Sequence, residues 1–583
     1  MTNKFGQLKD VPLQVLNKDC RKIYDRGMFL GKGGFARCYE FTDINSQEKF
    51  ACKVVTKSLI VKLNFKEKLT QEIEIQRSLK HPHVVKIFNH FDDSDNIYIL
   101  LELCPKKSLM ELHKRRRVIT EPEARYFTKQ IVEACEYIHN KNIIHRDLKL
   151  GNLFLTEMMD IKIGDFGLAT VIFSNDERKK TLCGTPNYIA PEILNKCGHS
   201  FEVDIWAIGC ILYTLLVGKP PFEASTLKDT YNRIKSNNYM VPVSVSTDAR
   251  SLIKYLLHSD PVKRPKIKDI LNFNFFTSGF LPSRLPTSCL TMAPKFSYSP
   301  ARQNKVLSEI SDSSKNAPDK KFYQEKERDE WYLIDLKNQI HNLFSHRLPQ
   351  VSMAEMDQAI HPASAPEIFV AKWVDYSDRY GLGYQLSDGS VGVLFNDSSK
   401  LLVDAPGEQL QYCDKKNNEF FFAVKNYPSY LEKKYTLLNH FRKYMREHLV
   451  HAVPTSSREG DELARLPILR TWFRTKAAII LHLTNGTLQM NFFADHVKLI
   501  VCPLMSAVSF IDSTKSLKTY KLNQLPTVGC EANILKKLQY TKHIVDRMLN
   551  PQQDRSNKVN YTALEAAHLP DVKSYGTRKI SQE

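Results

Sequence analysis

The chemistry that this sequence could perform is concentrated in two polar motifs, His145-Arg146-Asp147-Leu148-Lys149-Leu-Gly-Asn152 and Asp165-Phe166-Gly167. An aspartate such as Asp147 can accept the proton of a hydroxyl group and orient that group for attack. The amide of Asn152 and the carboxylate of Asp165 offer oxygen ligands of the kind that Mg²⁺ prefers. The ammonium group of Lys149 can neutralise a phosphate oxygen. These residue types at this spacing indicate phosphoryl transfer to a hydroxyl group.

A glycine-rich segment lies upstream and can bring backbone amides close to phosphate groups. Its residues are the first candidates for nucleotide binding: Leu30, Gly31, Lys32, Gly33, Gly34, Phe35, Ala36, Arg37 and Cys38. The next candidate is Lys53, with Glu72 of the helix-like run 68–79 as its expected ion-pair partner. Each of these two could instead be an ordinary surface charge. The downstream motifs favour the paired interpretation.

Together these motifs resemble protein kinases over residues 24–276. Lys149 and the segment from Gly184 to Glu192 are similar to serine/threonine kinases rather than tyrosine kinases. The resemblance implies an α+β, two-lobed catalytic domain with ATP and Mg²⁺ as cofactors. In it, Asp147 and Lys149 are catalytic, Lys53 binds phosphate, and Asn152 and Asp165 hold the metal.

The same resemblance assigns residues around the nucleotide and the activation segment. Leu101 corresponds to the gatekeeper, and the backbones of Glu102 and Cys104 to the adenine-binding hinge. Glu192 and Arg264 correspond to a buried ion pair that anchors the activation segment. Asp204 corresponds to the residue that holds the backbone of the catalytic loop.

Thr181 is the candidate activation site. It follows Arg178-Lys179-Lys180, a sequence that suits an upstream basophilic kinase. A phosphate on Thr181 would lie opposite Arg146 and could order the activation segment. The alternative is an unmodified loop threonine.

The second half of the chain contains an internal repeat. Residues 277–321 are rich in Pro, Ser, Thr and Lys and predict a flexible linker. Residues 322–368 predict a helical cap and connector, with an amphipathic helix over 322–346. The two copies, 369–449 and 468–550, share the order turn, Phe, Asp and Lys-Leu, and each predicts an antiparallel sheet followed by a helix. The tail, 551–583, predicts disorder.

The repeated modules resemble polo boxes, so the chain resembles the Polo-like kinases, and within them the mitotic Polo type. This resemblance implies binding of phosphorylated Ser/Thr proteins by His496 and Lys498, with Trp373 packing on the peptide. We expect His496 and Lys498 to share one face of a strand because they are two residues apart. A His-x-Lys pair can also be a solvated strand face, and Trp373 can be a core residue.

The resemblance also implies acidic Ser/Thr substrates, inhibition of the kinase by the polo boxes, and roles in mitosis and cytokinesis. The expected locations are the cytoplasm and nucleus, with the centrosome or spindle pole, kinetochore, and midzone or midbody. A rival interpretation is an inactive scaffold that only docks phosphoproteins. Retention of Lys53, Glu72, Asp147, Asn152 and Asp165 argues against that scaffold.

Composition sets further limits. The net charge of +19 favours acidic partners without identifying them. No zinc knuckle, RNP-like motif or basic zipper indicates nucleic-acid binding, and the 12 cysteines are without metal-ligand spacing.

The longest apolar run, 205–217, is too short for a membrane span and predicts a buried helix. The basic clusters at 106–107 and 114–117 fit either nuclear import or a solvated helix end. We expect a monomer without membrane insertion.

Overall fold

The structure is a computed structural model that describes residues 11–33, 36–63, 66–174, 177–181, 183–294, 320–448, 465–512 and 515–549. It divides into two compact units, residues 1–296 and 297–583. Gly34 and Phe35 of the glycine-rich segment lie outside the described residues, as do 295–319 of the expected linker and the expected tail 551–583.

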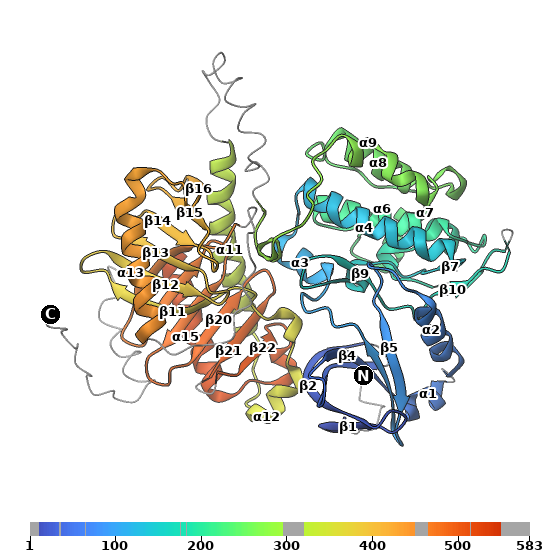
Figure 1. Cartoon of the computed structure of the whole chain (residues 1–583), viewed down its shortest axis with the longest axis horizontal. Helices are drawn as coiled ribbons and strands as arrows, with labels where there is room; N and C mark the ends of the chain where they lie inside the picture. The colour runs from blue at the N-terminus through green and yellow to red at the C-terminus, as the bar shows by residue number, and fades with distance from the viewer. Residues whose placement is uncertain are drawn as a thin grey trace, which may run out of the picture. The chain divides into compact units, whose positions relative to one another are not determined.

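The first unit begins with a six-stranded antiparallel sheet in the order β1-β2-β3-β4-β6-β5. Its strands are β1 (Gln14–Asn17), β2 (Lys22–Lys32), β3 (Ala36–Asp43), β4 (Lys49–Thr56), β5 (Ile87–Asp92) and β6 (Asn96–Leu101). Helices α1 (Lys57–Leu63) and α2 (Lys66–Ser78) follow β4 and pack beside the sheet (Figure 1). On β4, Phe50, Cys52 and Val54 point into the core of the sheet. Lys53 therefore points to the opposite face, as strand alternation requires.

Strand β1 precedes residue 24, where the sequence predicts the catalytic domain to begin. Val11 and Val15 are buried in the core of the sheet, and β1 pairs with the first residues of β2. The sheet therefore extends about ten residues further toward the N-terminus than the motifs indicate.

The remainder of the first unit is mainly helical. Its main helices are α3 (Leu109–Arg116), α4 (Glu121–Asn140), α6 (Glu202–Val217), α7 (Leu227–Lys235) and α8 (Thr247–Leu256), with shorter helices α5 (Pro191–Leu194) and α9 (Asn274–Thr277). A reciprocal capping box between Thr120 and Glu123 starts α4. Helix α6 contains the predicted apolar run and is buried almost throughout. Figure 1 shows α4 and α6 side by side.

Two short strand pairs carry the polar motifs between the helices. β7 (Ile143–Ile144) pairs with β10 (Thr170–Val171), and β8 (Leu153–Leu155) pairs with β9 (Ile161–Ile163). The motif from His145 to Asn152, called the catalytic loop below, joins β7 to β8, and Asp165 follows β9. Both motifs are thus loops fixed at each end by buried strands.

The beginning of the predicted linker is in fact part of the first unit. Leu285, Cys289 and Leu290 are buried in its core, around the 3₁₀ turn η5 (Thr287–Leu290). Arg116 donates hydrogen bonds to the carbonyls of Cys289 (2.6 Å) and Met292 (2.9 Å). The prediction failed here because these apolar residues have no helical or strand period.

Two arginines of the basic cluster 114–117 are packed into the folded unit. Arg116 forms a bidentate ion pair with the fully buried carboxylate of Glu123. Arg115 is only 5% exposed. Arg115 and Arg116 are therefore not solvated in the folded unit, whereas Arg117 is exposed.

The second unit contains two six-stranded antiparallel sheets, each a simple meander. The first comprises β11 (Val370–Tyr376), β12 (Gly381–Leu386), β13 (Val391–Phe395), β14 (Lys400–Val403), β15 (Gln409–Cys413) and β16 (Glu419–Ala423), followed by α13 (Glu432–His448). The second comprises β17 (Leu469–Arg474), β18 (Ala478–Leu483), β19 (Leu488–Phe492), β20 (Lys498–Cys502), β21 (Ala507–Ile511) and β22 (Leu517–Lys521), followed by α15 (Ala532–Leu549). Gly389 and Gly486 have φ of 94° and 81° at equivalent turns, which is why glycine occurs there.

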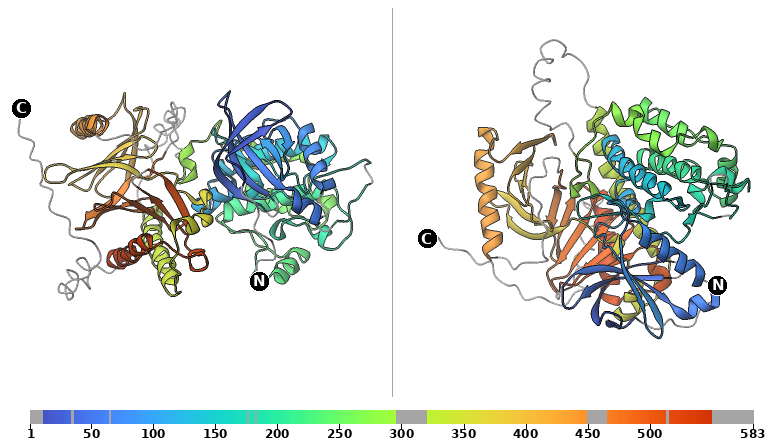
Figure 2. Two further views of the ribbon diagram at one scale, coloured as in Figure 1. Left: turned by 90° about the horizontal axis from the view of Figure 1, so that it is seen from below. Right: turned by 45° about the vertical axis from the view of Figure 1, so that its right-hand side comes forward.

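Each sheet of the second unit has two buried faces. One face packs on the helix of its own module, α13 or α15, and Figure 2 shows α13 lying across the first sheet. The other faces meet in a shared core that includes Leu382 and Tyr384 from the first sheet and Ile479 and Leu481 from the second. The amphipathic helix expected over 322–346 is α11 (Lys320–Phe344), which packs beside α15 through Leu336, Ile340 and Leu343.

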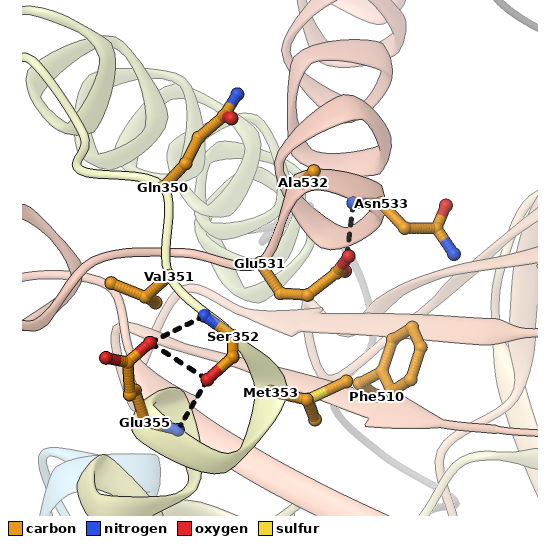
Figure 3. A pocket seen from close by; sticks show the side chains of 9 residues that line it. All are labelled: Gln350, Val351, Ser352, Met353, Glu355, Phe510, Glu531, Ala532 and Asn533. Carbon is orange, nitrogen blue, oxygen red and sulfur yellow. Dashed lines mark hydrogen bonds between the residues drawn. The ribbon is translucent and has the colours of Figure 1, made fainter.

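The connector after α11 meets the start of α15 at a pocket of about 630 Å³ (Figure 3). Glu531 accepts hydrogen bonds from the backbone N–H groups of Asn533 and Ile534 and so caps α15. Glu355 forms a capping box with Ser352 at the start of α12 (Met353–Met356). The carboxylates around this pocket therefore have structural roles.

No helix within the described residues is both long enough and apolar enough to cross a membrane.

Candidate active site and peptide-binding groove

The carboxylate of Asp147 is the centre of the candidate active site. Its Oδ1 accepts a hydrogen bond from the hydroxyl of Thr185 (2.7 Å), and its Oδ2 accepts from Lys149 Nζ (2.6 Å) and Asn152 Nδ2 (3.1 Å). Asn152 Nδ2 also donates to the Asp147 carbonyl at 2.9 Å. Asp147 is 9% exposed. The three predicted residues of the catalytic loop are thus brought together with Thr185, which sequence reasoning did not assign.

The backbone of this loop is held by Asp204. Its carboxylate accepts hydrogen bonds from the N–H groups of His145 (3.0 Å) and Arg146 (2.9 Å) and bonds His139 Nε2 (2.9 Å). Burial by itself would raise the pKa of Asp204, but the bond with His139 and the neighbouring charges lower it. Arg146 has a φ of 65°, a strained conformation that these bonds help to maintain.

Lys53, on β4, contacts two carboxylates, one on α2 and one in the loop that carries Asp165. Its ammonium lies 2.6 Å from Glu72 Oε1, on α2, and 3.7 Å from Asp165 Oδ1. Burial opposes protonation of Lys53, but the carboxylates of Glu72 and Asp165 outweigh it, so the pKa of Lys53 is raised. Lys53 therefore stays cationic at neutral pH. Phe166 is buried beside the ring of His145, with 4.9 Å between ring centroids, and fixes the segment that carries Asp165.

The glycine-rich segment spans the turn from β2 to β3. Gly33 N–H donates to the Ala36 carbonyl (2.8 Å), Gly31 pairs with Cys38 and Lys32 with Arg37. Leu30 is half-buried at the same end of β2. Burial raises the pKa of Cys38 to about 11, so its thiol is neutral.

The predicted hinge follows β6. The Glu102 N–H donates to the Lys86 carbonyl at 2.9 Å, so only the carbonyl of that residue is left to accept a hydrogen bond from an adenine amino group. Leu101 and Cys104 are half-buried on either side of it. The prediction that the backbones of Glu102 and Cys104 bind adenine therefore applies to the carbonyl of Glu102.

The activation segment is anchored at its end and exposed at Thr181. Arg264 and Glu192 form a buried bidentate pair with distances of 2.7 and 2.8 Å. Thr181 is exposed, and Lys179 exchanges two backbone hydrogen bonds with His199. Within the described residues the guanidinium of Arg146 makes one hydrogen bond, from Nε to the Leu168 carbonyl.

The residues predicted to bind a phosphopeptide, called the candidate groove below, lie where the two sheets of the second unit meet. Lys498, the first residue of β20, donates from Nζ to the carbonyl of Ala371 on β11 at 2.5 Å. Burial lowers the pKa of Lys498 to about 8. Trp373, on the same strand as Ala371, is half-buried and lies 6.5 Å from the ring of Phe493. Lys498 and Trp373 are therefore close to one inter-sheet boundary.

His496 is exposed near Lys498, but the strand argument that placed it there is wrong. It lies in the turn before β20 with a φ of 56°, so strand alternation does not set its direction. Two neighbours of Trp373, namely Phe493 and Arg474, were not assigned from the sequence. Phe493 contacts Trp373, and the guanidinium carbon of Arg474 lies 4.8 Å from the ring centroid of Phe493. The aromatic pair 492–493 and a cation close after Trp472 were the available signals.

Comparisons with known proteins agree with this division of the chain. The protein kinase domain model matches residues 24–276, and the model for the duplicated POLO box region matches residues 378–435 and 475–538. The chain is 52% identical to serine/threonine-protein kinase PLK1 of Xenopus laevis, covering 93% of each. It is 51% identical to serine/threonine-protein kinase plk-1 of Caenorhabditis elegans, covering 97% of this chain and 91% of the relative. Identity to serine/threonine-protein kinase polo of Drosophila melanogaster is 46% over 93% of this chain and 97% of the relative.

The fold and these matches define a serine/threonine protein kinase followed by two polo boxes. The chain belongs to the Polo-like serine/threonine kinases. The resemblance stated from the motifs is thereby confirmed, as are the two-lobed kinase and polo-box architecture and the enzyme class. Below, the sheet from β11 to β16 with α13 is box 1, and the sheet from β17 to β22 with α15 is box 2.

Proposed function

We propose that this kinase transfers the γ-phosphate of ATP to a Ser or Thr hydroxyl that Asp147 orients and deprotonates. Lys149, bonded to the same carboxylate, neutralises the transferred phosphate. Lys53 binds the α and β phosphates, for which its raised pKa keeps it cationic. The observation that carries this proposal is the three-donor arrangement around Asp147.

The residues present fit a magnesium ion. Asn152 uses its Nδ2 toward Asp147, which leaves its Oδ1 as a ligand atom. The carboxylate of Asp165 is 47% exposed and accessible to a cation. Both are hard oxygen ligands, and when bound the ion neutralises charge on the phosphates. The residues of the glycine-rich segment and the backbones of Glu102 and Cys104 enclose the nucleotide.

Phosphorylation of Thr181 activates the kinase in this proposal. The two terminal nitrogens of Arg146 are not used by its bond to Leu168 and can receive a phosphate bidentately. The basic run from Arg178 to Lys180 directs an upstream basophilic kinase to this threonine.

The polo boxes dock phosphorylated Ser/Thr proteins. His496 and Lys498 bind the phosphate, and Trp373 packs on the peptide. The half-buried ammonium of Lys498, bonded to a carbonyl and depressed in pKa, supports this role because a phosphate would supply the counter-charge that its surroundings lack. Docking targets the kinase to acidic Ser/Thr substrates.

We further propose that the protein acts as a monomer in mitosis and cytokinesis, in cytoplasm and nucleus. Its sites there are the centrosome or spindle pole, kinetochore and midzone or midbody. In the absence of a docked phosphopeptide the polo boxes inhibit the kinase, and docking relieves that inhibition.

Transfer of radiolabelled phosphate from Mg-ATP to casein by the full chain tests the catalytic proposal. We expect transfer to serine and threonine, increased by a phosphothreonine peptide and not by its unphosphorylated twin. Absence of transfer, together with phosphopeptide binding, would instead favour the inactive scaffold.

A further inference from the structure

The interface between the boxes contains polar side chains within an apolar core. On β19, Leu488, Met490 and Phe492 point toward α15. Gln489 and Asn491 therefore point toward box 1. Gln489 is completely buried, and Asn491 is 8% exposed. Buried amides are costly unless every donor and acceptor is bonded. The hydrogen-bond partners of these two side chains therefore indicate their structural role.

The amide of Gln489 is fully bonded, and two of its bonds reach box 1. Its Oε1 accepts from the Val370 N–H (2.9 Å), and its Nε2 donates to the Val370 carbonyl (2.9 Å) and to Asn491 Oδ1 (2.8 Å). Val370 begins β11, where the register shifts between Val370 and Lys372 as in a β-bulge. Val370 keeps Leu386 as its strand partner in β12, and β11 is the edge strand of its sheet. A side chain of box 2 thus bonds backbone groups of Val370 on this edge strand, next to the bulge.

Ala371, the residue after Val370 in the bulge, is bonded to Lys498 of the candidate groove. The Ala371 carbonyl accepts the hydrogen bond from Lys498 Nζ. Asn491 is the direct cross-strand neighbour of Lys498, so their side chains lie on the same face of the sheet. Gln489, Asn491 and Lys498 therefore form one polar row that meets two consecutive residues of β11. Trp373 is two residues further along that strand.

A side chain of box 1 also bonds the bulge of box 2, but it is a tyrosine rather than a glutamine. In the repeat, Gly392 corresponds to Gln489, and Leu469 corresponds to Val370. The Leu469 N–H, at the equivalent register shift of β17, donates to the hydroxyl of Tyr384 (3.0 Å). Any Cβ on Gly392 would lie 2.4 Å from Tyr384 Cζ, so glycine makes room for that ring. Each box binds the other's bulge, but only the bond from Gln489 lies beside Lys498.

We propose that Gln489 is a positioning residue of the phosphopeptide groove. By fixing the β11 bulge it holds the Ala371 carbonyl against the ammonium of Lys498 and sets the position of Trp373 relative to that ammonium. Gln489 does not touch the ligand. This inference rests on the proposed phosphopeptide binding.

The test compares Gln489→Met with Tyr384→Phe in the full chain. Gln489→Met removes two buried hydrogen bonds to the bulge of β11, and Tyr384→Phe removes one to the bulge of β17. We therefore expect both changes to lower the Tm by a few degrees. Fluorescence anisotropy with a phosphothreonine peptide and its plain twin separates positioning from stability. Gln489→Met should weaken phosphopeptide binding about tenfold, with little change for the plain peptide, and Tyr384→Phe should change it less than about twofold.

A transplant gives a second readout. Leu481→Tyr combined with Gln489→Gly copies the Tyr384 and Gly392 arrangement into box 2 and returns an acceptor to the Val370 N–H. We expect it to recover phosphopeptide affinity relative to Gln489→Met, and it remains informative if the methionine variant fails to fold. Failure to recover in a folded transplant would contradict the inference.

The controls separate this inference from the function on which it rests. A wild-type chain that prefers the phosphorylated peptide, with equal affinity in Gln489→Met, overturns the positioning role alone. Equal weakening by Tyr384→Phe also overturns it, since a general loosening of the interface would then suffice. A wild-type chain without preference for the phosphorylated peptide overturns the proposed docking function and the positioning role together.

Discussion

The candidate active site and the candidate groove treat charge in opposite ways. In the candidate active site the assigned cations are paired with carboxylates of the chain: Lys53 pairs with Glu72, and Lys149 pairs with Asp147. In the groove, Lys498 is bonded to a carbonyl, and among the described residues no carboxylate lies in contact with it. The catalytic charges are preorganised by one another, whereas the groove is electrically incomplete without a ligand.

This difference predicts how each site responds to substitution. Removing a catalytic group breaks a constellation that the protein itself holds, so binding should survive while chemistry is lost. Removing a groove cation should abolish ligand binding without disturbing the chain, because the cation gains its counter-charge only from the ligand.

The largest expected effect is that of Asp147→Asn. Turnover should fall by about 10²–10⁴-fold, since the substrate hydroxyl loses its base, while ATP binding and phosphopeptide affinity stay nearly unchanged. Lys53→Met is the matched control, because it should weaken nucleotide positioning as well. Steady-state phosphorylation of casein and titration with a fluorescent nucleotide measure the two effects, and wild-type turnover by Asp147→Asn would refute the assignment.

The next effect is that of replacing His496 by Ala and Lys498 by Met together. A phosphate that loses two charge-assisted donors should lose about 3 kcal/mol, or roughly a hundredfold in affinity. Binding should fall to the level of the unphosphorylated peptide. Kinase activity without peptide should be retained, and stimulation by phosphopeptide lost. Unchanged anisotropy titrations in the double variant would mean that the phosphate binds elsewhere.

The two sites also differ in how far the sequence alone could predict them. The residues of the candidate active site could be grouped from the sequence because His145 to Asn152 and Asp165 to Gly167 are short loops at fixed spacing, so sequence order nearly determines geometry. Thr185 was missed because its bond to Asp147 crosses the activation segment.

The candidate groove combines residues from different strands that no local pattern connects. The family resemblance assigned Lys498 and Trp373 to this region, but the strand argument placed His496 on a strand when it lies in a left-handed turn. Phe493, Arg474 and Gln489 were missed because their partners come from strands far along the chain. Leu285, Cys289 and Leu290 were assigned to the predicted linker 277–321 because the apolar residues there follow no helical or strand period.

A smaller effect is expected at Thr181, where phosphorylation would add an anion that the two unused terminal nitrogens of Arg146 can bind. Thr181→Ala should leave activity at least about tenfold below that of the phosphorylated wild type, since a charge-assisted bond to Arg146 contributes about 1.5 kcal/mol or more. Thr181→Asp should recover only part of it, because one carboxylate carries less charge. Activity after treatment with a basophilic kinase measures this, and normal activation of Thr181→Ala would exclude it as the switch.

The smallest effect concerns the pH dependence of the groove. The pKa of Lys498 is lowered from 10.5 to about 8, so the protonated fraction should fall about fourfold between pH 7 and 8.5. Phosphopeptide affinity should fall by the same factor, since the phosphate is already a dianion over this range. The unfolded chain binds more protons than the folded chain between pH 8 and 10.5, so Lys498 contributes a free energy of unfolding that rises with pH. Affinity and this contribution to stability therefore change in opposite directions.

Lys498→Arg is the control for this last prediction, because a guanidinium stays charged across the whole range. Its phosphopeptide affinity should be flat from pH 7 to 8.5, whatever its absolute value, when measured by anisotropy at constant ionic strength. A wild-type affinity that is also flat would mean that Lys498 is fully protonated and paired before the ligand arrives. The groove would then resemble the active site, and the contrast between a self-sufficient site and one completed by its ligand would fail.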